Sequence, residues 1–140
     1  MADDYKMTAL RMGQSSITLH LAGEFYNACY LGGYVIECYS KILLKHLGTP
    51  ATGHALSSLT NTVVNNYLAM NSTAAGQLTR SGVMCDPLVD FAHILSNWNA
   101  NKRYDDIHTA IWNSSMSTHY QSEINIALRY ISKLQLDGLI

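Results

Sequence analysis

Apolar residues recur along much of the chain at steps of three and four, the spacing of an α-helix that buries one face. The strongest case is residues 24–47, with one stripe on Phe25, Ala28, Gly32, Val35, Tyr39 and Ile42 and an adjacent one on Cys29, Ile36, Leu43 and Leu47. Two adjacent stripes make a wide apolar face, which is typical of a helix that other helices surround. We therefore expect this segment to be the central helix of the fold. Gly32 and Gly33 each cost about 1 kcal/mol against alanine in mid-helix, so we expect a neighbouring helix to pack closely there.

Weaker periodic patterns predict further helices. Residues 3–21 form the first, because Met7, Leu10, Gln14, Ile17 and Leu21 recur at helical spacing with one polar gap. Residues 54–68 form another, with Leu56, Leu59, Val63 and Tyr67 inside. A helix over 86–98 follows an Asp-Pro start signal, and a short one begins near Asp105. The last spans 117–134, with Tyr120, Ile124, Ala127 and Ile131 inside.

The polar segments between these helices complete the predicted architecture. Residues 48–53 are rich in glycine and proline, and residues 71–82 are small and polar, so both are expected to be loops. No segment shows the apolar–polar alternation of a strand. The prediction is one all-α domain over residues 1–140, built as a compact bundle of about five helices.

The composition narrows the range of partners. Charged residues make up only 14% of the chain and the net charge is −1, against a typical charged share of about 25%. Such a chain does not bind long nucleic acid by broad neutralisation of phosphates, so any action on RNA needs a small local basic site. Either serine, threonine and asparagine supply the polar surface, or part of the surface is buried against another chain.

The cysteines and the N-terminal sequence favour a cytoplasmic protein. Cys29, Cys38 and Cys85 lie in or beside apolar runs without Cys-x-x-Cys spacing, which is typical of reduced thiols. The acidic N-terminus has no apolar core of signal-peptide length. Glu37 and Lys41 interrupt the longest apolar stretch, so we expect no membrane-spanning helix.

Three motifs resemble those of HEPN (higher eukaryote and prokaryote nucleotide-binding) domains. The run AGEFYNACYLGGYVIECYSKILLKH at 22–46 resembles the family's second helix, with the pattern A-x-Y-L-x-G-Y-x-x-E-x-x-x-K matched at Ala28, Tyr30, Leu31, Gly33, Tyr34, Glu37 and Lys41. GHALSSL at 53–59 resembles the family's Gly-His motif, and WNANKRY at 98–104 resembles its Trp followed by Arg-Tyr. The three occur in the family's order.

This resemblance implies a bundle of about five helices that is usually a homodimer. Many family members are metal-independent endoribonucleases of toxin–antitoxin or antiviral defence systems, and several are encoded beside a small nucleotidyltransferase that restrains them. Others are non-catalytic modules that bind a nucleotide, RNA or a protein partner. Both functions remain open for this chain.

The candidate catalytic residues are Arg103 and His108, in the segment RYDDIH. Family ribonucleases carry an Arg, four to six residues, then a His, and here four residues separate the two. When the 2′-hydroxyl of RNA attacks the neighbouring phosphate, the reaction needs a base for the hydroxyl proton, an acid for the leaving oxygen and a positive group that binds the phosphate. Histidine can transfer protons near neutral pH, and the planar guanidinium group of arginine binds phosphate. Tyr104 either stacks on a base or anchors a helix. Two features depart from the family's ribonucleases: Ala110 replaces a frequent Tyr, and two acidic residues lie inside the motif.

Other polar residues have both a structural and a functional interpretation. Glu37, Lys41 and Tyr34 form a polar stripe on the central helix. In the structural interpretation, Glu37 and Lys41 are an ion pair or part of a solvated face. In the functional interpretation, the stripe lines a dimer cleft and its residues support the site or bind substrate. The pairs His20–Glu24 and His119–Glu123 have helical spacing, but the Glu-x-x-His motif of di-metal bundles is absent, so we predict no metal and no cofactor.

Three hypotheses follow from the sequence. The first is a homodimeric RNA-cutting effector that uses Arg103 and His108. The second is a binding or regulatory module without catalysis. The third is a structural assembly protein whose low charge reflects a large self-interface.

Overall fold

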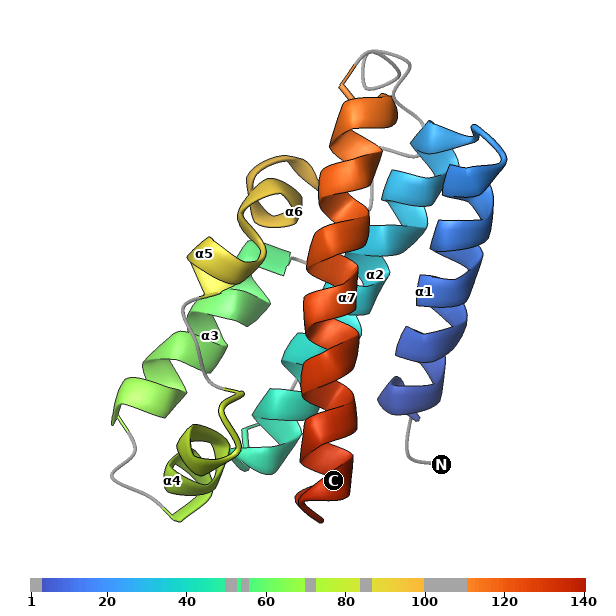
Figure 1. The fold of residues 1–140 in the computed structure, drawn as a ribbon. Coiled ribbons are helices and arrows are strands. Elements are labelled where there is room, and N and C mark those ends of the chain that lie inside the picture. The colour runs from blue at the N-terminus through green and yellow to red at the C-terminus, as the bar shows by residue number, and fades with distance from the viewer. Residues whose placement is uncertain (1–3, 50–52, 54–55, 70–72, 84–86, 100–110) are drawn as a thin grey trace.

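The computed structural model describes residues 4–49, 53, 56–69, 73–83, 87–99 and 111–140. This part of the chain is helical and contains no strand, which confirms the predicted all-α class. Its helices are α1 (Tyr5–Leu21), α2 (Phe25–His46), α3 (Leu56–Ala69), α4 (Thr73–Arg80), α5 (Pro87–Asp90), α6 (Ala92–Asn97) and α7 (Ser114–Leu136). They pack as a bundle in which α1, α2 and α7 lie side by side and α3 to α6 cover the other flank (Figure 1). No helix of these ranges is long and apolar enough to cross a membrane.

The central position of α2 is confirmed. All ten consecutive residues from Val35 to Leu44 are buried, so this half of the helix is covered on every side. Helices α1, α3, α6 and α7 all contact it. The two predicted stripes are buried except for Phe25, which is half-buried. The core is therefore organised around α2, as the wide apolar pattern predicts.

Small residues let α1 approach α2 and α7 closely. The buried residues of α1 are Ala9, Gly13 and Ser16. The Ser16 hydroxyl donates to the Ala28 carbonyl of α2 at 2.7 Å and accepts from the Gln121 amide of α7 at 2.8 Å. Each of these polar groups is thus paired inside the core, which avoids the cost of burying them without a partner. The large apolar residues that defined α1 in the sequence do not form this buried face.

Two local predictions are wrong. Residues 71–82 were expected to be a loop, but they contain α4, whose Leu78 is fully buried and which continues into a buried Val83. A single buried leucine among small polar residues leaves too weak a periodic pattern to reveal a helix of two turns. The helix expected over 86–98 is broken into α5 and α6 at Phe91 (φ −125°, ψ 35°), whose ring is buried against Tyr39 at a centroid distance of 5.5 Å.

The start of α7 lies three residues before the predicted one. Its N-cap is Asn113, whose side-chain oxygen accepts from the backbone N–H of Met116 at 3.0 Å. Asparagine is among the best capping residues because it satisfies one of the unpaired amides of the first turn. The predicted inside residues of α7, which are Tyr120, Ile124, Ala127 and Ile131, are all buried.

Candidate functional site

The predicted catalytic residues Arg103 and His108, and Tyr104 beside them, lie in 100–110, outside the described residues. The structure describes the residues on both sides of this segment. Trp98 precedes it and Trp112 follows it, and both rings are buried, at 6% and 1% exposure. The geometry of these two tryptophans therefore defines the frame of the candidate site.

Trp98 is held by the residues of α2 that carry the family-like pattern. Its indole Nε1–H donates to the Tyr30 carbonyl at 2.9 Å, and the Tyr34 ring meets it edge-on with centroids 5.1 Å apart. The ring lies so close to Gly33 that a Cβ there would be 2.0 Å from Trp98 Cε2. Only glycine leaves room for this contact. Tyr34 is thus a half-buried packing residue whose hydroxyl bonds that of Tyr30 at 2.8 Å.

Trp112 is held beside the end of α6. Its Nε1–H is shared between the Tyr120 hydroxyl at 3.1 Å and the Asn97 side-chain oxygen at 3.3 Å. Tyr120 also donates a hydrogen bond to that oxygen of Asn97. Burial of Tyr120 raises its pKa far above the ordinary value, so its hydroxyl remains a neutral donor. Asn97 on α6 and Trp112 before α7 are therefore fixed to each other.

Glu37 and Lys41 form a buried ion pair. Their charged groups are 3.0 Å apart, and the residues are only 4% and 7% exposed. The Lys41 ammonium also lies 5.6 Å from the centre of the Tyr5 ring of α1, within the range of a cation–π contact. The interpretation as a structural pair fits this arrangement, and the solvated-face interpretation does not, because both side chains are buried.

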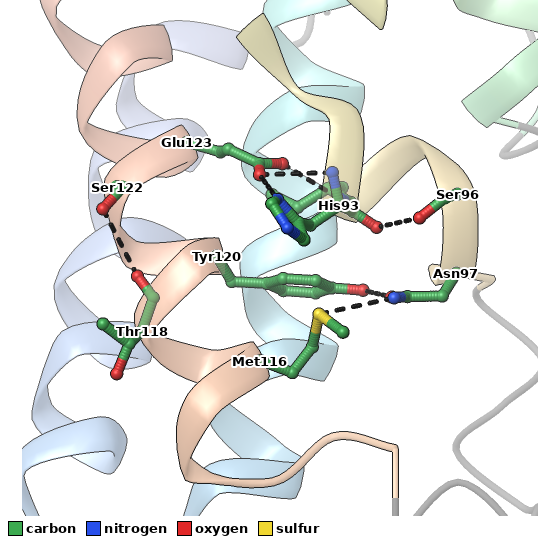
Figure 2. Close-up of polar contacts among 9 residues, drawn as sticks. His93, Ser96, Asn97, Met116, Thr118, Tyr120, Ser122 and Glu123 are labelled. Carbon is green, nitrogen blue, oxygen red and sulfur yellow. Dashed lines mark hydrogen bonds and ion pairs between the residues drawn. The ribbon is translucent and has the colours of Figure 1, made fainter. Parts of the chain in front are cut away.

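A further polar cluster joins α6 to α7 (Figure 2). The buried carboxylate of Glu123 accepts from the backbone N–H groups of His93 and Ile94, at 3.2 and 2.9 Å, and from Nδ1 of His93 at 2.7 Å. The ring of His119 stacks on that of His93, with centroids 4.0 Å apart and planes 5° apart. The His93 side chain remains 42% exposed. A buried carboxylate thus fixes one nitrogen of a half-exposed imidazole and leaves Nε2 as the nitrogen that can face a substrate.

The sequence interpretation missed this cluster as a unit. His119 and Glu123 were visible as a helical four-residue pair, but His93 lies on another helix, thirty residues earlier. Only tertiary packing brings the three side chains together, and a single sequence contains no pattern that links them. No group of three or more His, Cys, Asp or Glu side chains suited to a metal ion occurs among the residues the structure describes.

Comparison with known proteins gives no match: no protein-family model, no curated protein and no solved structure is significantly similar to the chain. The fold by itself defines only the structural class of the protein, which is an all-α bundle. A functional assignment has to come from the residues themselves.

Proposed function

We propose that the protein is a HEPN-type, RNA-directed effector that cleaves RNA without a metal ion, acting as a homodimer in a toxin–antitoxin or antiviral defence system. In this proposal Arg103 binds the scissile phosphate and His108 transfers a proton. A small nucleotidyltransferase is the proposed protein partner. The proposed compartment is the cytoplasm, where buried free thiols such as those of Cys29 and Cys38 stay reduced.

The observation that carries the proposal is the His93–Glu123 pair. Cleavage by the 2′-hydroxyl needs two proton carriers, one to accept the hydroxyl proton and one to protonate the leaving oxygen. His108 supplies one in the proposal. In the proposal His93 supplies the other, and what supports this role is a hydrogen bond of 2.7 Å from its Nδ1 to the buried carboxylate of Glu123, which orients the ring and favours one tautomer.

The packing of Trp98 supports the family resemblance on which the proposal also depends. Tyr30, Gly33 and Tyr34 belong to the pattern of the second helix, and Trp98 begins the third motif. In the fold these residues form one contact unit, with the indole bonded to the Tyr30 carbonyl and packed on Gly33. The shared pattern thus has a structural reason: it seats the tryptophan that precedes Arg103.

The test is cleavage of single-stranded RNA by the purified protein in the presence of EDTA. His108→Ala should lose at least about 100-fold in rate, since general acid–base groups contribute about 10² to 10⁴-fold. His93→Asn should lose a similar factor, because asparagine keeps a donor for Glu123 but has no Nε2. Thr109→Ala, next to His108, is the matched control and should cut at the wild-type rate.

Two results would count against this function. If the wild-type protein leaves RNA intact, or if the two histidine variants cut as fast as the control, the chain is not a ribonuclease of this design. RNA that is bound but not cut would instead favour the non-catalytic binding module.

A further inference from the structure

One face of α1 is apolar and exposed. Met7, Leu10, Ile17 and Leu21 are 51, 40, 39 and 79% exposed, and Gln14 between them is exposed as well. Their spacing of three, four, three and four residues puts all five on one side of the helix, along about 21 Å of its length. Single exposed apolar residues are common on protein surfaces, but an aligned row of them is typical of an interaction surface. We call this row the α1 stripe.

The α1 stripe is distinct from the face of α1 that packs in the core. Ala9, Gly13 and Ser16 make the buried face, and they bring the helix against α2 and α7. The large side chains are thus not needed to hold α1 in its own subunit. Helix α1 also lies at the edge of the bundle, where a second molecule can approach it (Figure 1).

The pattern of the α1 stripe fits a second copy of the same chain. Its spacing is that of the a and d positions of a coiled coil, and its middle position is the polar residue Gln14. A two-fold interface places one residue next to its own copy on the axis. An amide both donates and accepts hydrogen bonds, so Gln14 can pair with itself there. Two apolar residues then lie on each side of the axis.

We propose that α1 pairs with α1 of a second copy, antiparallel, about a two-fold axis near Gln14. Met7 and Leu10 of one copy then lie beside Leu21 and Ile17 of the other. The antiparallel direction is favoured by charge, because a parallel pair would place Lys6, at a g position, beside Arg11, at an e position of the other copy. The pairing deepens the proposed function by naming the surface of its homodimer, and it requires no activity toward RNA.

The first test is the mass of the protein in solution by light scattering. The wild-type chain should have twice its monomer mass of 15.5 kDa. Ile17→Glu should weaken association by more than about 100-fold, since it buries an unpaired charge at the interface, and should give the monomer mass. Val89→Glu is the matched control, because Val89 is 74% exposed on α5, and it should remain dimeric. Leu21→Glu, at the most exposed position of the stripe, is the second variant should Ile17→Glu fail to fold.

The second test is the direction of the pair, by disulfide cross-linking in a Cys85→Ser background. Cys29 and Cys38 are buried and do not compete. A mixture of Met7→Cys and Leu21→Cys proteins should give the mixed cross-link, and neither protein alone should cross-link efficiently. A cross-link of Met7→Cys with itself would overturn the antiparallel arrangement.

Failure of this surface and failure of the proposed function give different results. A wild-type monomer, or an Ile17→Glu variant that stays dimeric, overturns the α1 pairing. If that dimeric variant also cuts RNA, the ribonuclease function stands and its homodimer uses another surface. If the α1 dimer forms and no RNA is cut, the pairing stands and the ribonuclease function fails.

Discussion

At the scale of single residues, Gly33 and Trp98 connect the sequence pattern to the geometry of the site. The indole of Trp98 fills the space where a side chain at position 33 would lie, and its ring is rigid and nearly fully buried. A Cβ at position 33 would lie 2.0 Å from this buried ring, and no flexible side chain could rotate away to remove the clash. The glycine is therefore required by the tryptophan, although glycine lowers helix stability.

Gly33→Ala should lower the free energy of unfolding by about 3 kcal/mol, the upper part of the usual range for overpacking. Gly76→Ala is the matched control, since its Cβ would meet only the far end of Arg80 at 3.4 Å. That change should be neutral or stabilise α4 by up to about 1 kcal/mol. Urea unfolding followed by circular dichroism measures both. Equal effects at the two glycines would show that Trp98 can move.

The buried pair of Glu37 and Lys41 gives a second prediction at this scale. Lys41→Met removes the ammonium 3.0 Å from Glu37 and leaves a carboxylate in the core, which should cost about 3–5 kcal/mol. The double change Glu37→Leu with Lys41→Met should recover much of this loss, because no charge then remains buried. Lys45→Met, one turn further on an exposed position, should change stability by less than about 0.5 kcal/mol. Chemical unfolding of the three variants compares them; a double variant as unstable as the single one would contradict the argument.

At the scale of elements, α6 is stabilised from outside itself. Its N-cap residue Phe91 makes no side-chain capping bond, and the carboxylate of Glu123 on α7 accepts from the N–H groups of His93 and Ile94 instead (Figure 2). A negative charge at this position also interacts favourably with the helix dipole. The break at Phe91 is thus compensated by a tertiary cap.

Glu123→Gln should destabilise the fold by about 1.5–3 kcal/mol, the usual contribution of hydrogen bonds to a charged group. The loss should be local, so the amides of His93 and Ile94 should exchange with deuterium faster while those of α2 change little. Glu24→Gln is the control, because Glu24 is exposed and makes no side-chain capping bond to α2. Unchanged exchange at Ile94 in Glu123→Gln would argue against the tertiary cap.

Sequence reasoning worked best for elements with strong periodicity. The central helix and the inside residues of α7 were predicted because many large apolar side chains repeat on one face. It failed for α4, where Leu78 is the chief apolar signal, and at Phe91, where burial of one ring overrides helix continuity. In α1 the large residues mark an exposed face, because small residues make the buried one.

The candidate site was predictable only in part. The ion pair of Glu37 and Lys41 follows from helical spacing within one element, and the structure brings the two together. Arg103 and His108 remain predictions, since they lie outside the described residues. The contact of His93 with Glu123 depends on how α6 packs on α7, which local pattern does not determine.

At the scale of the whole molecule, the core contains several groups that must stay neutral. Burial raises the pKa of the Cys29 thiol to about 12, against a smaller opposite effect of its hydrogen bond with Ser117. Burial, reinforced by the charge of Glu37, raises the pKa of the Cys38 thiol to about 11. Burial also raises the pKa of Tyr120. Ionising any of them in place would put a charge in the apolar interior.

These shifts predict how the stability of the fold depends on alkaline pH. A group whose pKa is higher in the folded state than in the unfolded one favours folding fully at pH values below its unfolded pKa, which is 9.0 for the thiols. As the pH rises from 9 toward 11, the thiols ionise in the unfolded chain but stay protonated in the folded one. Each thiol should then lower the free energy of unfolding by about 1.4 kcal/mol per pH unit. The urea midpoint should therefore fall steeply over this range and should be nearly flat between pH 7 and 8.

The variants Cys29→Ala and Cys38→Ala separate the thiols from other alkaline effects. Each is less stable at neutral pH because it removes a buried sulfur, yet each should show a shallower fall of the urea midpoint above pH 9 than the wild type. The comparison uses the slope of the urea midpoint with pH and not the midpoint itself. The cavity left by each substitution lowers the midpoint at every pH and therefore does not affect the comparison. Parallel slopes in all three proteins would mean that the thiols do not titrate as buried groups, and that solvent reaches the centre of the bundle around α2.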